Sequence, residues 1–325
     1  MFIVGIDVGN YDTKSQHTST PTGYDGPFTA KPPITGEYIC VNGEYYTPSN
    51  ERFNYEKDKT KSDRCFILSL FAIAKEIHYY VSKTRDNLTH DETQMLISGV
   101  KEIGIGAGLP PTHFTEKRTK ELIEYYRSKM KDGLSFEWND YKYNVRLVAC
   151  DIYPQGGAGA IDKENTFRKT YPQYYVVDIG GYTVDVLKYS DNKLDGKWQT
   201  KEEGIITMFD DISTKVAVNY DMTLDMQSLE NILKGQNTII ADEVVSFVKE
   251  MTKQHADAII DLVRQLGLEF KAFPVVFLGG GALLLEKYIR QNALVNEKSV
   301  LFISDPCCNA NGYAKFLKRK IEKRH

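Results

Sequence analysis

The chain has 325 residues, of which 42% are hydrophobic and 26% charged, and its formal net charge is −3. These values are typical of a globular protein long enough for two domains, and they exclude the strongly basic footprint of a chain that binds nucleic acid directly. The five cysteines show no metal-ligand spacing, and neither a signal peptide nor an apolar run of membrane-spanning length is recognised, so we expect a cytoplasmic protein with no membrane partner.

A short apolar strand, an Asp-x-Gly turn and a second strand open the chain at residues 2–14. Asp7 ends the strand and Gly9 lies in the turn, which predicts a concave set of backbone N–H groups able to hold an anion. Taken alone, this pattern is more typical of an ordinary structural turn than of a phosphate site, because turns are rich in Asp and Gly.

The remainder of the first half is predicted as alternating loops, strands and helices. We expect a loop at 19–36, a hairpin at 37–46 turning on Asn42 and Gly43, an apolar helix at 63–82, a strand at 95–108, a helix at 112–130 and a hairpin at 134–150. The diproline after Gly108 and the spacing of the preceding glycines exclude a dinucleotide fingerprint.

The segment 153–161 follows, with small residues at 156–160, and we expect Gln155 to begin a helix there. A neutral amide that both donates and accepts hydrogen bonds is suited to orienting a hydrolytic water. Considered by itself, a glutamine beside glycines is more typical of an ordinary polar residue with satisfied hydrogen bonds.

A second copy of the opening pattern lies at 174–186, with Asp178 at the strand end and Gly180 and Gly181 in the turn. It aligns with the first hairpin without a gap, which indicates an internal duplication rather than two unrelated turns. A carboxylate that faces bound phosphates requires a cation between the two anions, so the pattern implies Mg²⁺.

The second half continues with an edge strand at 193–200 and helices at 202–219, 225–234 and 240–267. A buried strand at 274–278 then runs into three glycines and a helix at 282–291, a junction on which a flat ring or a phosphate can lie against backbone. A strand at 299–303 precedes a basic helix from Asn309 onward. We favour a helix docked on the first domain over a membrane or partner anchor.

Together, these motifs resemble the actin-like ATPase superfamily, whose signature is two phosphate hairpins, two connecting segments and an adenosine motif. The corresponding segments here are 7–14, 153–161, 178–185, 278–282 and 305–314. Within that superfamily the chain is most similar to ParM-type plasmid-segregation actins and their phage and archaeal relatives, because of the segments 108–114, 178–185 and 309–313.

This resemblance implies an α/β fold of two similar actin-like (ribonuclease H-like) domains around a central nucleotide cleft. Domain I would comprise residues 1–160 and 304–325, with a small insertion at about 19–62, and domain II residues 161–303.

The resemblance also implies the site residues. Gln155 and Asp178 would be catalytic, and Asp7 and Asp178 would hold Mg²⁺ through water. The nucleotide-binding residues would be Asp7, Gly9, Asn10, Tyr11, Asp12, Thr13, Lys14, Gly180, Gly181, Tyr182, Thr183, Glu203, Gly279, Gly280, Gly281 and Ala282. Tyr11 and Tyr182 depart from the small hydroxyl residues that are usual at their positions.

The function implied is a cytoplasmic, Mg-dependent ATPase with ATP and ADP as ligands. It would polymerise head to tail with copies of itself and act with a DNA-binding adaptor protein in plasmid or DNA segregation, without touching nucleic acid directly. A small-molecule kinase of the same superfamily and a non-polymerising, membrane-linked adaptor are the alternative functions.

Overall fold

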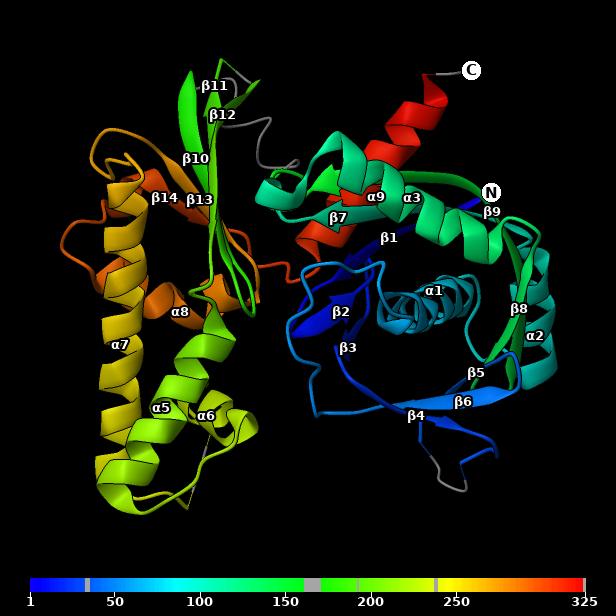
Figure 1. Ribbon diagram of the computed structural model, residues 1–325, viewed down its shortest axis with the longest axis horizontal. Coiled ribbons are helices and arrows are strands. Elements are labelled where there is room, and N and C mark those ends of the chain that lie inside the picture. Colours follow the sequence, from blue (N-terminus) through cyan, green and yellow to red (C-terminus); the bar gives the residue numbers. More distant parts are fainter. Residues whose placement is uncertain (33–35, 161–170, 192, 237–238, 324–325) are drawn as a thin grey trace. The chain divides into compact units, whose positions relative to one another are not determined.

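The computed structural model describes residues 1–32, 36–160, 171–191, 193–236 and 239–323. They form two compact units (Figure 1). Unit 1 comprises Met1–Gly159 and Cys307–His325, and unit 2 comprises Ala160–Pro306. Each unit is a mixed α/β structure with its own sheet, so the predicted α/β fold class is confirmed.

Unit 1 contains a nine-stranded sheet in the order β3-β2-β1-β7-β9-β8-β5-β6-β4. Its centre is parallel, because β1 pairs in parallel with β7 and β7 with β9, whereas the outer strands are antiparallel. The strands are β1 (Phe2–Val8), β2 (Asp12–Lys14), β3 (Ser19–Pro21), β4 (Tyr24–Phe28), β5 (Ile39–Val41), β6 (Glu44–Pro48), β7 (Glu102–Leu109), β8 (Leu134–Trp138) and β9 (Tyr141–Pro154).

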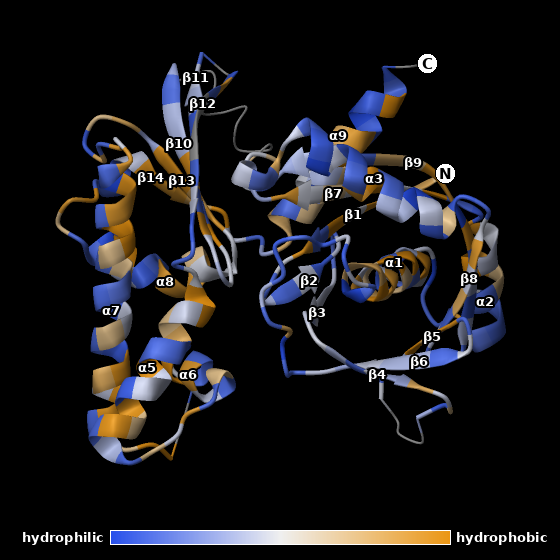
Figure 2. Ribbon diagram, viewed as in Figure 1, coloured by the Kyte–Doolittle hydropathy of each residue, from blue (hydrophilic) through white to orange (hydrophobic). Residues whose placement is uncertain are grey.

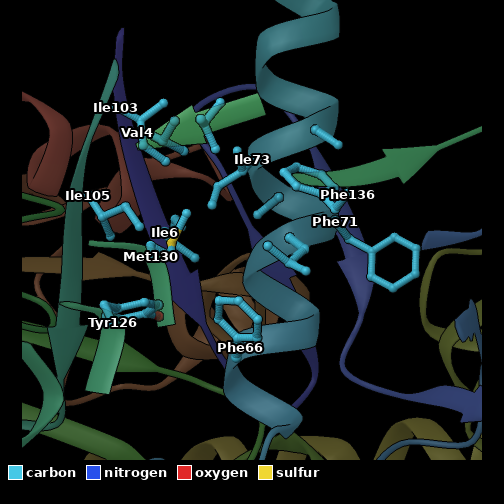
Figure 3. Close-up of a cluster of buried hydrophobic side chains, with 14 of the residues drawn as sticks. Val4, Ile6, Phe66, Phe71, Ile73, Ile103, Ile105, Tyr126, Met130 and Phe136 are labelled. Carbon is cyan, nitrogen blue, oxygen red and sulfur yellow. The ribbon is translucent and has the colours of Figure 1, made fainter. Parts of the chain in front are cut away.

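Helix α1 (Arg64–Ser82) supplies the core of unit 1. Figure 3 shows its Phe66 and Ile73 among the side chains of β1, β7 and α3. Of the described helices, α1 has the length and composition of a membrane span, contrary to the expectation from the sequence, but most of it is buried within the protein. Figure 2 shows it largely hydrophobic with a few polar residues, as expected of a helix enclosed on most sides.

Three further α-helices and one short helix complete unit 1. They are α2 (His90–Gly99), η1 (Pro111–His113), α3 (Glu116–Met130) and α9 (Cys308–Glu322). The predicted strand at 95–108 is wrong in its first part, where α2 lies. Thr89 accepts from the backbone N–H of Glu92 while the Glu92 carboxylate accepts from the Thr89 N–H, a capping box that starts a helix.

Glycines on β1 and β7 create the flat surface on which α9 packs. Successive side chains of a strand point to opposite faces, so Val4 and Ile6 join the core while Gly5 faces α9. A Cβ on Gly5 would lie 1.8 Å from the Ala310 carbonyl oxygen, and one on Gly106 2.6 Å from that of Tyr313. The alternate glycines of β7 are therefore a helix-packing surface, and α9 is docked on unit 1 as favoured from the sequence.

Unit 2 contains a five-stranded sheet in the order β12-β11-β10-β13-β14. Its strands are β10 (Gln173–Ile179), β11 (Val184–Ser190), β12 (Lys193–Lys201), β13 (Val275–Leu278) and β14 (Val300–Phe302). The helices among its described residues are α5 (Ile205–Tyr220), α6 (Met226–Leu233), α7 (Asp242–Gln265), α8 (Gly280–Gln291) and the short η2 (Glu297–Ser299). Buried Val248, Ile259 and Val263 place one apolar face of α7 inward, and Figure 2 shows the mixed character of this helix.

Candidate functional site

The first hairpin joins β1 to β2 with Asp7 opposite Lys14 and Val8 opposite Thr13. Opposed residues of an antiparallel pair project to the same face, so the acidic and basic side chains of Asp7 and Lys14 share one face. A Cβ on Gly9 would lie 2.8 Å from the Asp12 carbonyl oxygen, which explains why glycine occupies this turn. The hairpin therefore has the tight turn that the sequence predicts.

The hydroxyls of Thr13 and Thr22 brace this turn from inside. Thr22 Oγ1 donates to the Gly9 carbonyl at 2.6 Å and lies 3.0 Å from Thr13 Oγ1. Thr13 is only 1% exposed. Its hydroxyl is thus engaged in the fold, while Asn10, Tyr11 and the other turn residues are partly exposed.

Gln155 and Asp7 lie together at the carboxyl edge of the parallel strands. Gln155 Nε2 donates to Asp7 Oδ1 at 2.9 Å, and the Gln155 backbone N–H donates to the Leu109 carbonyl at 2.9 Å. These contacts link the ends of β1, β7 and β9, the edge at which open α/β sheets bind ligands. Asp7 is 9% exposed, so its carboxylate is nearly enclosed.

The sequence predicts that Gln155 begins a helix, but residues 155–160 form a turn in the structure. Residues 161–170 lie outside the described part of the chain. Gly156 has a φ of 76°, a value that suits glycine, and its N–H donates to Asn309 Oδ1 at 3.0 Å. Gly312 of α9 packs against the Ala158 carbonyl, where a Cβ would approach to 2.0 Å. Helix α9 therefore holds the turn that carries Gln155.

Two cations that the sequence analysis did not select also contact the first hairpin. Arg52 Nε donates to the Tyr11 carbonyl at 2.8 Å, its guanidinium lies 3.7 Å from the centre of the Tyr11 ring, and it pairs with Asp12 at 3.7 Å. Lys59 Nζ donates to the Val8 carbonyl at 2.7 Å. The only sequence signal for either residue was the charged composition of the loop around 51–63.

The second hairpin joins β10 to β11 with Asp178 opposite Asp185. The Gly180 N–H donates to the Thr183 carbonyl at 2.8 Å and closes the turn. Both carboxylates are buried, at 6% and 3% exposure. Asp185 accepts hydrogen bonds from the hydroxyls of Thr183 and Thr200, which offset part of the cost of burying its carboxylate.

The carbonyls of this second turn cap helix α5. The N–H groups of Ile205 and Ile206 donate to the carbonyls of Gly180 and Gly181 at 3.1 and 2.7 Å, and the Gly204 N–H donates to Tyr182 at 3.0 Å. The first backbone N–H groups of α5 are therefore bound to carbonyls of the hairpin, and these hydrogen bonds fix the hairpin against the start of the helix. Glu203 is exposed just before the helix.

The strand β13 ends beside the second hairpin and leads into α8 through three glycines. Gly279 has a φ of 93°, and a Cβ there would lie 2.4 Å from Asp178 Oδ1. Gly280 is exposed, whereas Gly281 and Ala282 are buried. A Cβ on Gly281 would approach the side chains of Ile179 and Ile205 to 2.6 Å. Unit 2 thus brings Asp178, Gly180 and Gly279 together.

Asp7 and Asp178 are equivalent in local structure, since each is the penultimate residue of a strand that runs into a glycine turn. Among the described residues, no group of three or more His, Cys, Asp or Glu side chains could hold a metal by itself. Magnesium commonly uses one or two carboxylates together with waters and substrate phosphates, and each unit by itself offers one carboxylate of this kind.

Residues 176–291 match the family model of the archaeal actin homologue MreB-like C-terminal domain. No curated protein matches the sequence. The fold is similar to the crystal structure of Ta0583, an archaeal actin homologue, with a TM-score of 0.74 and 17% identity over 98% of this chain and 100% of that one. A complex of Ta0583 with ADP has a TM-score of 0.72 at the same identity and coverage.

A ParM filament of 15 strands from Clostridium botulinum is also similar, with a TM-score of 0.73 and 17% identity over 98% of this chain and 99% of that one. The Alp12 filament structure has a TM-score of 0.65 and 14% identity over 98% and 99%. The resemblance to the actin-like superfamily and to ParM is therefore confirmed at the level of the fold. The chain has an actin-like fold.

Proposed function

We propose that this chain of actin-like fold is an Mg-dependent ATPase that assembles into filaments. The observation that carries the proposal is the repeated Asp-x-Gly hairpin, present once in each unit, with Gln155 bound to the aspartate of the first. A structural turn needs neither a buried carboxylate at the strand end nor an amide aimed at it. The ADP complex of the similar archaeal protein supports a nucleotide as the ligand.

In this proposal the turn residues of the two hairpins bind phosphates through backbone N–H groups. Asp7 and Asp178 hold Mg²⁺ through water, and Lys14, which faces the same side as Asp7, supplies a positive charge. Residues 279–281 offer backbone without side chains for the adenosine, and the exposed Glu203 is placed at the ribose.

Hydrolysis requires a water aligned with the terminal phosphate. We assign this role to Gln155, whose amide can accept from the water through Oε1 while Nε2 donates to Asp7 at 2.9 Å. The Asp7 contact fixes the orientation of the amide, which is what a water-positioning residue needs. The chain would then turn over slowly until neighbouring subunits complete the active state.

Filament assembly is supported by the ParM and Alp12 structures, both of which are filaments. A head-to-tail contact between unlike surfaces grows into an open polymer unless its rotation closes a ring. We propose that ATP favours this polymer, that hydrolysis weakens it, and that a DNA-binding adaptor couples it to plasmid segregation in the cytoplasm.

Sedimentation of the purified protein tests the proposal. With ATP and Mg²⁺ the protein should pellet above a critical concentration, and the pellet should shrink as phosphate is released. A non-hydrolysable ATP analogue should stabilise the pellet, and omission of Mg²⁺ should remove it. A protein that stays monomeric with ATP and instead phosphorylates a small hydroxyl compound would establish the kinase alternative.

A further inference from the structure

Lys59 lies at the point where the first hairpin leaves β1. Its ammonium donates to the carbonyl of Val8, at 2.7 Å, and Val8 stands between Asp7 and Gly9. The loop that carries Lys59 precedes α1, far from the hairpin in the sequence. This contact places the Lys59 ammonium at the end of the strand that bears Asp7, the proposed Mg²⁺ carboxylate.

The charge of Lys59 has no anionic partner in the described part of the protein. The Val8 carbonyl is the one hydrogen-bond acceptor of its ammonium there, and no carboxylate pairs with it. Lys59 is only partly exposed. A partly buried ammonium without a counter-charge is unfavourable, and its two remaining donors suit an anion that binds beside the hairpin.

Arg52, unlike Lys59, has an anionic partner among the described residues. It reaches the same hairpin, but its guanidinium is engaged with Asp12 and with the Tyr11 ring and carbonyl. Arg52 therefore holds the turn in place, whereas Lys59 keeps its charge uncompensated.

More positive charge surrounds Lys59. Burial lowers the pKa of His113, and the neighbouring cations Arg118, Lys57 and Lys59 lower it further. Arg118 also donates to the Lys57 carbonyl at 3.0 Å, which ties α3 to the same loop. Three cations therefore lie near His113, and one carboxylate, that of Asp58, opposes their effect on its pKa.

We propose that Lys59 is a further phosphate-binding residue, which contacts the terminal phosphate of ATP and so distinguishes ATP from ADP. The proposal rests on the nucleotide function above and adds a specificity-determining residue to it. The terminal phosphate is the appropriate partner because Lys59 lies next to Asp7, whose carboxylate is bound by the water-orienting Gln155. The competing interpretation is that Lys59 only fastens its loop to β1.

Binding measurements separate the two interpretations. A non-hydrolysable ATP analogue and ADP, each with Mg²⁺, would be titrated into the full chain at protein concentrations below those that scatter light. Lys59→Met should weaken the analogue roughly tenfold or more, as expected for a lost charged hydrogen bond, and ADP less than about threefold. Lys59→Arg should restore most of the preference for the analogue.

Lys61→Met is the matched control, because Lys61 is exposed in the same loop, and it should leave both affinities unchanged. If Lys59→Met reduces both affinities equally, or neither, while lowering the Tm of the nucleotide-free protein, Lys59 is a brace and the inference is wrong. If the wild-type chain binds neither nucleotide, the proposed function itself fails, and that result is visible before any variant is made.

Discussion

Gln155 Nε2 donates to Asp7 Oδ1 at 2.9 Å and so joins residues that lie at the ends of two different strands. The contact connects the residue proposed to orient water with a residue proposed to hold Mg²⁺. The amide must therefore present its oxygen away from Asp7, because its nitrogen is committed to the carboxylate. One hydrogen bond thereby sets the direction of the amide oxygen that would accept a hydrogen bond from the attacking water.

Replacement of this amide should affect turnover more than binding. We expect Gln155→Ala to slow phosphate release by about 10²-fold while ATP affinity stays within a few-fold, because the lost interaction belongs to the transition state. Single-turnover phosphate release and equilibrium binding measure the two effects. Weaker binding with unchanged turnover of the bound ATP would show that Gln155 has a structural role only.

Removal of Asp178 should abolish hydrolysis. Asp178→Ala deletes the carboxylate that is proposed to position the metal, while the backbone donors of the second hairpin remain for the phosphates. Asp211→Ala is a suitable control, since Asp211 is exposed on α5 and pairs with Lys215 of the same helix. Wild-type turnover in the Asp178 variant would refute the assignment.

Gly279→Ala tests the close approach of α8 to Asp178. A methyl group at this position has an unfavourable φ of 93° and meets Asp178 Oδ1 at 2.4 Å. Gly267→Ala imposes a similar φ of 91° but has no atom within 4 Å, so it isolates the backbone strain of about 1–2 kcal/mol. We expect Gly279→Ala to lower the free energy of unfolding by about 1 kcal/mol or more beyond the loss in Gly267→Ala, and to weaken nucleotide binding. Urea unfolding compares the two, and equal losses would contradict the collision.

Gly5→Ala tests the packing of α9 on β1. The added methyl would lie 1.8 Å from the Ala310 carbonyl oxygen, and backbone on both sides leaves no flexible group to move. We expect unit 1 to be destabilised by about 3 kcal/mol or more. Gly99→Ala, at the end of α2 with no atom within 4 Å, should be neutral or stabilising by up to about 1 kcal/mol. Thermal unfolding of both variants measures the difference.

His78 should make stability depend on pH. Burial against Trp138 and Tyr141 lowers the pKa of His78 below its usual value of about 6.5. The unfolded chain then binds the proton more readily, so the free energy of unfolding should fall as pH drops below about 6.5 toward the lowered pKa. His78→Phe keeps an aromatic ring and should flatten this decline between about pH 7 and 5. Denaturant titrations at each pH measure the free energy of unfolding. If this free energy falls with pH as steeply in His78→Phe as in the wild type, His78 does not contribute to the decline.

The sequence was sufficient for features whose physical cause is local. The turn at Asn42 and Gly43 forms with positive φ at both residues, as the Asn-Gly pair predicts. The two Asp-x-Gly hairpins also form where the pattern placed them. Helix α2 differs from the predicted strand because the capping box at Thr89 starts a helix ahead of the apolar alternation that favours a strand.

Features that depend on contacts between distant parts of the chain cannot be predicted from local sequence patterns. No local pattern distinguishes Lys59 from other lysines of a charged loop, because its partner carbonyl belongs to β1. The spacing of the β7 glycines excludes a nucleotide motif but does not predict their packing against Tyr313 of α9, which is distant in the sequence. Gln155 was selected by its chemistry, but its bond to Asp7 follows from the pairing of β1, β7 and β9.

The discontinuity of unit 1 imposes an order on biosynthesis. Residues Met1–Gly159 leave the ribosome first, yet their sheet face at Gly5 and Gly106 stays uncovered until α9 has been translated. Unit 2 is continuous, so it can fold while the chain is still growing. Unit 1 must wait for the C-terminal helix. A nascent chain therefore carries this sheet face uncovered while unit 2 is being translated, and a chain that terminates before α9 lacks the helix that holds the Gln155 turn.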